Sequence, residues 1–139
     1  MKLLGFNFTK ISIEKKKDSL KDLKIENQVD ITNVSEVNQD VLKSDDDFLA
    51  VTFKYVIDYK PEIARIEMVG SVLLSINSKI AKEVLKKWKG QDTPDEFRIP
   101  LFNVIFRKAG LKALELEDQL NLPLHMQMPA IRKDDLKTK

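Results

Sequence analysis

"FLAVTFKYVIDYKPEIARIEMVGSVLLSIN", residues 48–77, consists of two runs in which apolar and polar side chains alternate. Alternation at every second residue places one set of side chains on one face of a β-strand. Lys60, Pro61 and Glu62 separate the runs, and proline fixes the φ angle that a turn position prefers. The stretch therefore predicts an antiparallel hairpin with one buried face. The predicted buried positions are Leu49, Val51, Phe53, Tyr55, Ile57 and Tyr59 in the first run, and Ala64, Ile66, Met68, Gly70, Val72, Leu74 and Ile76 in the second.

The residues before this hairpin predict two further strands. In the first, Phe6 and Phe8 share one parity whereas Ile11 and Ile13 share the other. Such a change of phase is typical of a β-bulge, and we expect one near Thr9.

The second of these strands is expected around residues 25–31, where Ile25, Val29 and Ile31 share a face. The polar stretch 35–47 that follows is expected to be a loop. It ends in three aspartates, but it lacks the ligand spacing and the glycine of a calcium loop and is interpreted as a solvated turn.

After residue 77 the apolar period changes from 2 to 3.6, which predicts a helix capped by Asn77 or Ser78 and stopped by Gly90. Its polar face is rich in lysine and is interpreted as a solvent face. Next, Thr93-Pro94 is a helix start signal, but Pro100 is expected to end that turn and to open a separate long helix that reaches about Gln119.

This long helix carries two apolar strips. The first comprises Leu101, Phe102, Ile105, Phe106, Ala109, Ala113, Leu116 and Leu120, and the second comprises Val104, Leu111 and Leu114. One strip can pack on a sheet, whereas the second needs another partner, either the segment that follows or another subunit. We therefore expect a dimer or tetramer with Val104, Leu111 and Leu114 at the interface.

Residues 120–129 form an apolar ribbon with the periodicity of a strand. Apolar side chains occupy every even position, while Pro123 and Pro129 lie between them and cannot donate a ladder hydrogen bond. The ribbon is expected to be extended, with one edge that does not pair.

Four strands followed by two helices indicate an α+β domain: a four-stranded antiparallel sheet with two C-terminal helices packed on one face. A chain of 139 residues fits one domain. We expect this domain to span residues 1–131, and residues 132–139 to form a polar, disordered tail.

The composition offers little for catalysis. The chain has no cysteine, a single histidine (His125) and four scattered glycines, so neither a multi-histidine metal site nor a glycine-rich phosphate loop can be built. We expect no catalytic residue, no metal and no cofactor, and a structural or solvent-exposed role for His125. The net charge of +2 argues against nucleic acid as a partner. No stretch resembles a signal peptide or a membrane span, so the expected location is the cytoplasm, without membrane insertion.

The order of these elements resembles the SecB family of export chaperones over about residues 48–128. The resemblance lies in the hairpin followed directly by a helix, in the helix entry at Ile99-Pro100, and in the exit through Leu120-Asn121-Leu122-Pro123. SecB proteins have a four-stranded antiparallel sheet with two helices behind it and assemble as a dimer of dimers. Their acidic sheet face helps them dock the SecA motor, whereas the net charge of +2 and the lysine-rich helix make SecA docking doubtful here. The family also includes SecB-like chaperones of toxin–antitoxin systems.

The resemblance implies a non-enzymatic, ATP-independent chaperone that binds apolar segments of unfolded or precursor polypeptides. The residues expected to contact such clients are Leu122, Leu124, Met126, Met128, Phe102 and Phe106. One alternative is a scaffold or regulatory oligomer of the same fold, whose apolar surface is used entirely in assembly. A third is a small enzyme whose site has no recognisable motif.

Overall fold

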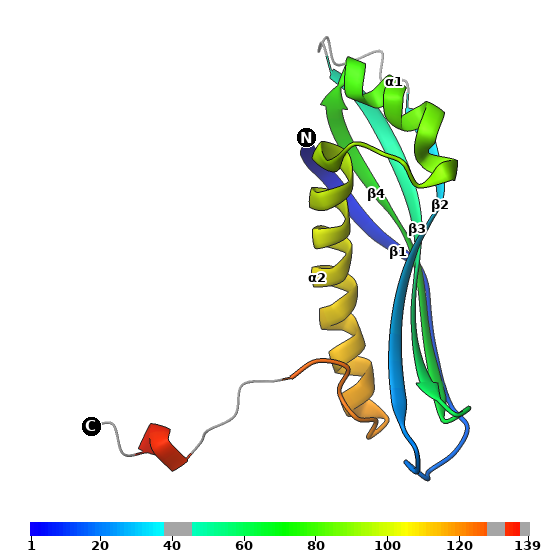
Figure 1. Cartoon of the computed structure of the whole chain (residues 1–139), viewed down its shortest axis with the longest axis vertical. Helices are drawn as coiled ribbons and strands as arrows, with labels where there is room; N and C mark the ends of the chain where they lie inside the picture. Colours follow the sequence, from blue (N-terminus) through cyan, green and yellow to red (C-terminus); the bar gives the residue numbers. More distant parts are fainter. Residues whose placement is uncertain (38–45, 128–132, 137–139) are drawn as a thin grey trace.

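The computed structural model describes residues 1–37, 46–127 and 133–136 of the chain. Four long strands, β1 (Lys2–Lys15), β2 (Lys24–Val37), β3 (Asp46–Lys60) and β4 (Ala64–Asn77), form one antiparallel sheet in the order β1-β4-β3-β2 (Figure 1). The hairpin predicted from the sequence is the central pair, β3 and β4. Its register sets Tyr59 opposite Ala64 and Phe53 opposite Gly70. The edges of the sheet are β1 and β2.

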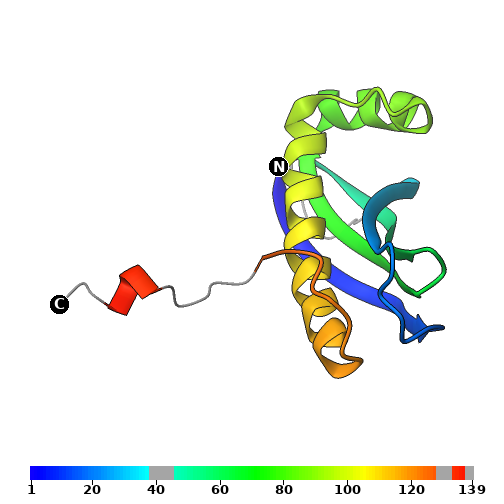
Figure 2. The same ribbon diagram turned by 60° about the horizontal axis from the view of Figure 1, so that its bottom comes forward.

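The helices follow the sheet in sequence. They are α1 (Ser78–Lys87), the 3-10 turn η1 (Trp88–Gly90), α2 (Asp95–Gln119) and the short η2 (Lys133–Leu136). α1 lies across one end of the sheet and α2 runs along its length, both on the same face (Figures 1 and 2). This confirms the predicted α+β fold with two helices on one sheet face. Within the expected C-terminal tail, the structure describes only η2.

The core lies between this face and the helices. The alternating positions predicted to be buried in the hairpin are all buried, and their apolar side chains are at most 4% exposed. They pack against Phe97, Leu101, Ile105, Ala109 and Ala113 of α2, and against Ala81 and Val84 of α1.

Two local predictions for the strands and α1 are confirmed. The pairing of β1 with β4 shifts between Phe8 and Lys10, so that Phe8 lies opposite Gly70 and Ile11 lies opposite Met68. The bulge thus keeps both parities on the helix side of the sheet. At the start of α1, the Asn77 side chain caps the helix by accepting a 2.8 Å hydrogen bond from the backbone N–H of Lys79.

The predicted break at Pro100 is wrong. α2 is continuous from Asp95, and Pro100 lies inside it. A proline here removes one backbone hydrogen bond, whereas Phe97 and Leu101, on either side of it, are 2% and 0% exposed. Burial of these two side chains on the sheet keeps both turns in one helix. Thr93 does not cap the helix: Pro94 is the N-cap residue, and its carbonyl accepts from the N–H groups of Phe97 and Arg98.

The predicted loop 35–47 is shorter than expected. Residues 35–37 continue β2 and residues 46–47 begin β3, because the two long strands pair as far as Val37 and Phe48. The rest of the predicted loop lies outside the described residues.

Candidate functional site

A groove of about 370 Å³ opens on the helix side of the sheet, between the edge strand β2, η1 and the first half of α2. Its apolar wall consists of Val29 and Ile31 of β2, Trp88 of η1, and Phe97 and Phe102 of α2. Polar side chains of Lys89, Gln91, Thr93 and Arg98 complete the η1 and α2 sides. The groove therefore combines some aromatic and branched apolar side chains with a lining that is largely polar.

The β2 edge itself forms one wall of this groove. Four consecutive residues, 28–31, line it, although neighbouring side chains of a strand point to opposite faces. β2 pairs with β3 on one side only, so the backbone N–H and C=O groups of its other side have no partner strand in the sheet. An edge of this kind can pair with an extended segment of another chain.

The apolar surface continues along α2 beyond the groove. The Phe106 ring lies 6.4 Å from the Phe102 ring and packs edge-on against Tyr55 of β3, with 6.2 Å between centroids. Phe106 nevertheless remains 45% exposed, and Phe102 is half-buried. Both residues expected on α2 therefore present aromatic surface to solvent, and Phe102 lines the groove.

Residues 120–127, called the strap below, run back along α2 after its C-terminal end. Asn121 turns the chain with a φ of 55°. The expected strand-like ribbon is wrong, because these residues form no strand and their side chains do not alternate by parity. Leu122 is 5% exposed and belongs to the core, whereas Leu124 and Met126 are 40% and 45% exposed. Met128 lies outside the described residues.

The strap is held by a buried polar cluster of Tyr59, Glu117 and His125. Glu117 of α2 is fully buried, and its carboxylate accepts hydrogen bonds from the hydroxyl of Tyr59 and from the backbone N–H of His125 at 3.1 Å. The Nδ1 atom of His125 lies 2.7 Å from the other carboxylate oxygen, which assigns the imidazole proton to Nδ1. Tyr59 also contacts the carbonyl oxygen of Pro123 at 2.8 Å. The cluster therefore joins β3, α2 and the strap.

Both tyrosines near this carboxylate keep their protons at neutral pH. Burial and then the hydrogen bond to Glu117 raise the pKa of Tyr59 well above its ordinary value. Burial, assisted by the charge of Glu117, raises the pKa of Tyr55 to about 12. Tyr59 consequently remains a hydrogen-bond donor to the carboxylate over the physiological pH range.

The strap crosses α2 at Gly110. A Cβ atom added there would meet Met126 Cε at 3.4 Å and His125 Nε2 at 3.7 Å, both ordinary van der Waals distances. Because Gly110 lies inside a helix, we expect Gly110→Ala to raise the free energy of unfolding by up to about 1 kcal/mol. Chemical denaturation measures this change. Gly90→Ala, whose added Cβ meets nothing within 4 Å, is the matched control. A loss of stability in Gly110→Ala would mean that the strap packs more tightly on the helix than described.

The second apolar strip of α2 is only partly exposed. Leu111 is 64% exposed and Leu114 is half-buried, whereas the half-buried Val104 packs against the core. On the neighbouring edge strand β1, Leu3 and Ile11 lie opposite Leu74 and Met68 and are 38% and 39% exposed on the same side of the sheet. Apolar surface therefore extends from the outer side of α2 and along the β1 edge.

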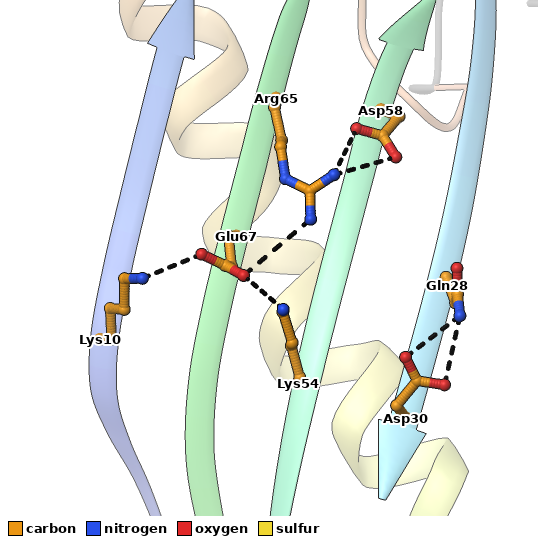
Figure 3. Close-up of polar contacts among 7 residues, drawn as sticks. All are labelled: Lys10, Gln28, Asp30, Lys54, Asp58, Arg65 and Glu67. Carbon is orange, nitrogen blue, oxygen red and sulfur yellow. Dashed lines mark hydrogen bonds and ion pairs between the residues drawn. The ribbon is translucent and has the colours of Figure 1, made fainter. Parts of the chain in front are cut away.

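The face of the sheet away from the helices carries charged pairs instead (Figure 3). Glu67 lies between Lys54 at 2.8 Å and Lys10 at 2.9 Å, and Arg65 pairs with Asp58 at 3.0 Å. The hydrogen bonds from Lys54 and then Lys10 lower the pKa of Glu67 to about 2. The acids at the centre of this face are thus neutralised by bases on neighbouring strands.

Neither a metal site nor a membrane-spanning helix is found in the described part of the chain. No group of three histidine, aspartate or glutamate side chains there could hold a metal ion. No helix in the same residues is long and apolar enough to cross a membrane.

Among solved structures, the chain is similar to the SecB-like chaperone Rv1957 of Mycobacterium tuberculosis in complex with a ChAD peptide from the HigA1 antitoxin. The TM-score is 0.58 at 7% identity, over 94% of this chain and 86% of that one. The chain therefore has the SecB-like fold that the family resemblance of its sequence implied. No protein-family model matches the sequence, and no curated protein matches it significantly.

Proposed function

We propose that this protein is an ATP-independent chaperone that binds apolar segments of unfolded polypeptides on the helix side of its sheet. The observation that carries the proposal is the groove between β2, η1 and α2. Exposed apolar side chains continue beyond it: Phe106 on α2, and Leu124 and Met126 on the strap. A client would bury apolar side chains on these residues and pair its backbone with the β2 edge. Neither step needs a nucleotide.

The single tryptophan offers a direct test of groove occupancy. Trp88 is half-buried, lines the groove, and is the only tryptophan in the chain. Titration with a tryptophan-free, reduced and alkylated unfolded protein should shift its emission to shorter wavelength, because the client removes water from the ring. The folded form of the same reporter protein is the control and should cause no shift. An unchanged spectrum despite measured binding would place the client elsewhere.

The fold similarity supports this proposal over an enzyme. The similar structure from M. tuberculosis contains a peptide bound to a SecB-like chaperone. For the present chain we propose peptide segments as the ligand class on the evidence of its own groove. SecA docking is not part of the proposed function, because the acids at the centre of the sheet face away from the helices are paired with lysine and arginine.

The rival function is a scaffold that uses its apolar surface only in assembly, and the second strip of α2 offers surface for such assembly. We propose that this strip, Val104, Leu111 and Leu114, forms a subunit interface together with the β1 edge. This assignment leaves the groove, on the β2 side, free for clients. The rival predicts instead that the groove is filled by another subunit.

The proposed interface predicts a homo-oligomer. Light scattering should give a mass of about 32 or about 64 kDa, twice or four times the 16.0 kDa of one chain. Leu111→Lys should lower this mass, because a charge would replace a 64% exposed leucine at the interface. A mass of one chain across micromolar concentrations would contradict the assignment.

A further inference from the structure

We propose that Glu117 is a positioning residue for the client site: it holds the strap in the conformation that presents Leu124 and Met126 to a client. This inference rests on the proposed function. A buried carboxylate that does not touch the client would order part of the client-binding surface before the client binds.

The first observation is the convergence of donors on one carboxylate. Glu117 accepts from Tyr59 on β3 and from both the backbone and the side chain of His125 on the strap. The side chain of His125 is only 2% exposed, so the imidazole ring points inward. Glu117 thereby fixes the position and the orientation of one strap residue.

The second observation concerns the neighbours of that residue. Leu124 and Met126 flank His125 and are 40% and 45% exposed, although both are large and apolar. With the His125 side chain held inward, Leu124 and Met126 keep almost half of their surface exposed, although the tip of Met126 reaches α2 at Gly110. Large apolar side chains gain by turning into a core, and the strap retains the opposite arrangement while its polar bonds are intact. The cluster therefore keeps two apolar side chains available at the surface.

The third observation is that the strap has few other attachments. The backbone N–H groups of Asn121 and Leu122 donate to the carbonyls of Asp118 at 3.3 Å and Glu117 at 2.9 Å, and Lys15 donates to the Leu120 carbonyl at 3.2 Å. The last of these attachments is at Pro123, whose carbonyl oxygen lies 2.8 Å from the Tyr59 hydroxyl. Beyond Pro123, His125 Nε2 is buried and finds no hydrogen-bond partner among the described residues. A buried polar atom without a partner opposes packing of the strap onto α2. The position of residues 124–126 therefore depends on the Glu117 carboxylate.

A strap that is ordered in advance binds more tightly than one that must be ordered by the client, because the loss of conformational entropy occurs before binding. Loss of the cluster should therefore weaken client binding without opening the core. A merely structural role for Glu117 predicts instead a fall in melting temperature with client affinity intact in the molecules that remain folded.

The test uses Glu117→Gln in the full chain, with Asp118→Asn as the matched control on the adjacent, exposed carboxylate. In Glu117→Gln one carboxylate oxygen becomes an NH₂ donor, so at least one of the three donors from Tyr59 and His125 loses its acceptor. Amide exchange should accelerate about tenfold at His125, whose N–H bonds to the Glu117 side chain. It should stay unchanged at Leu122, whose N–H bonds to the Glu117 backbone. Affinity for a reduced and alkylated unfolded protein, measured by fluorescence anisotropy, should fall about tenfold.

A second pair of variants keeps the inference testable if Glu117→Gln does not fold. His125→Asn retains a donor near the position of Nδ1 and removes the unpartnered Nε2, so it should keep client affinity close to that of the wild type. His125→Leu removes the donor and should lose affinity as Glu117→Gln does. Equal affinity in these two variants would overturn the inference.

The remaining outcomes separate this inference from the proposed function. Faster exchange at His125 with unchanged affinity would show that the strap is not client surface, while the groove still binds. Increased affinity would show that the strap covers the site, and would overturn the positioning role. A wild type that binds no unfolded protein would overturn the proposed function itself.

Discussion

Changing Leu124 and Met126 together to serine should lower client affinity about 30-fold while the melting temperature stays within a few degrees of the wild type. Leu124 and Met126 are 40% and 45% exposed, so about half of each side chain remains to be covered by a client. Full burial of one such side chain stabilises by ~1.5–3 kcal/mol, so burial of the exposed half contributes about 1 kcal/mol per residue to the free energy of binding. The ~2 kcal/mol lost with both side chains corresponds to about 30-fold in affinity. Stability changes little because both side chains are already almost half exposed and the Glu117 cluster still holds the strap.

Leu122→Ser, at the third residue of the strap, is the matched control for this double variant. Leu122 is 5% exposed and packs in the core, so its loss should cost about 2–5 kcal/mol. Thermal melting and anisotropy titration should thus separate the two variants. Early melting of the double variant would assign Leu124 and Met126 to the core. Unchanged stability with unchanged affinity would mean that the strap has no part in binding.

Replacement of Gly70 by alanine should destabilise the fold by about 1–3 kcal/mol, the usual effect of overpacking a core. An added Cβ would lie 2.5 Å from the backbone oxygen of Asn7 and 2.7 Å from the Phe53 ring. The backbone of β1 and a fully buried ring cannot both retreat without disturbing the sheet. For a chain of this length the melting temperature should fall by about 3 to 10 °C.

Gly5→Ala is the matched control, because its added Cβ would meet only Leu73 Cβ at 3.8 Å. Its stability should stay within about 0.5 kcal/mol of the wild type. A Gly70→Ala variant as stable as Gly5→Ala would contradict the close packing of β1 on β4 at this point.

The parts of the fold that were predictable from the sequence are those that short-range patterns determine. Strict alternation predicted the β3–β4 hairpin and its buried face, and the change of parity after Phe8 predicted the position of the β1 bulge. The change of period at Asn77 marked the start of α1. Each signal requires only neighbouring residues.

Features that depend on tertiary packing were not predictable in the same way. The effect of Pro100 was overestimated, because burial of Phe97 and Leu101 outweighs one lost hydrogen bond. The parity of the strap failed for a similar reason: a buried carboxylate draws His125 inward from a position that periodicity assigned to the polar face.

Of the candidate client residues, Phe102 lines the groove, whereas Leu122 belongs to the core. Trp88, Phe97, Val29 and Ile31 were not predicted to line a groove, because the sequence does not specify how η1 lies beside β2. The Glu117 cluster had a partial signal: Glu117 continues the buried series Leu101, Ile105, Ala109, Ala113 at intervals of four residues. A carboxylate in such a series indicates a buried hydrogen-bond acceptor.

The measurement that most directly tests the central claim is suppression of aggregation without nucleotide. The purified protein is added to an unfolding, aggregation-prone reporter enzyme, and light scattering is followed with ATP present or absent. The account predicts that scattering is suppressed at near-equimolar protein, equally in both conditions, and that the Leu124, Met126 double serine variant suppresses it less. Aggregation at the rate of the reporter alone, or suppression only with ATP, would contradict it.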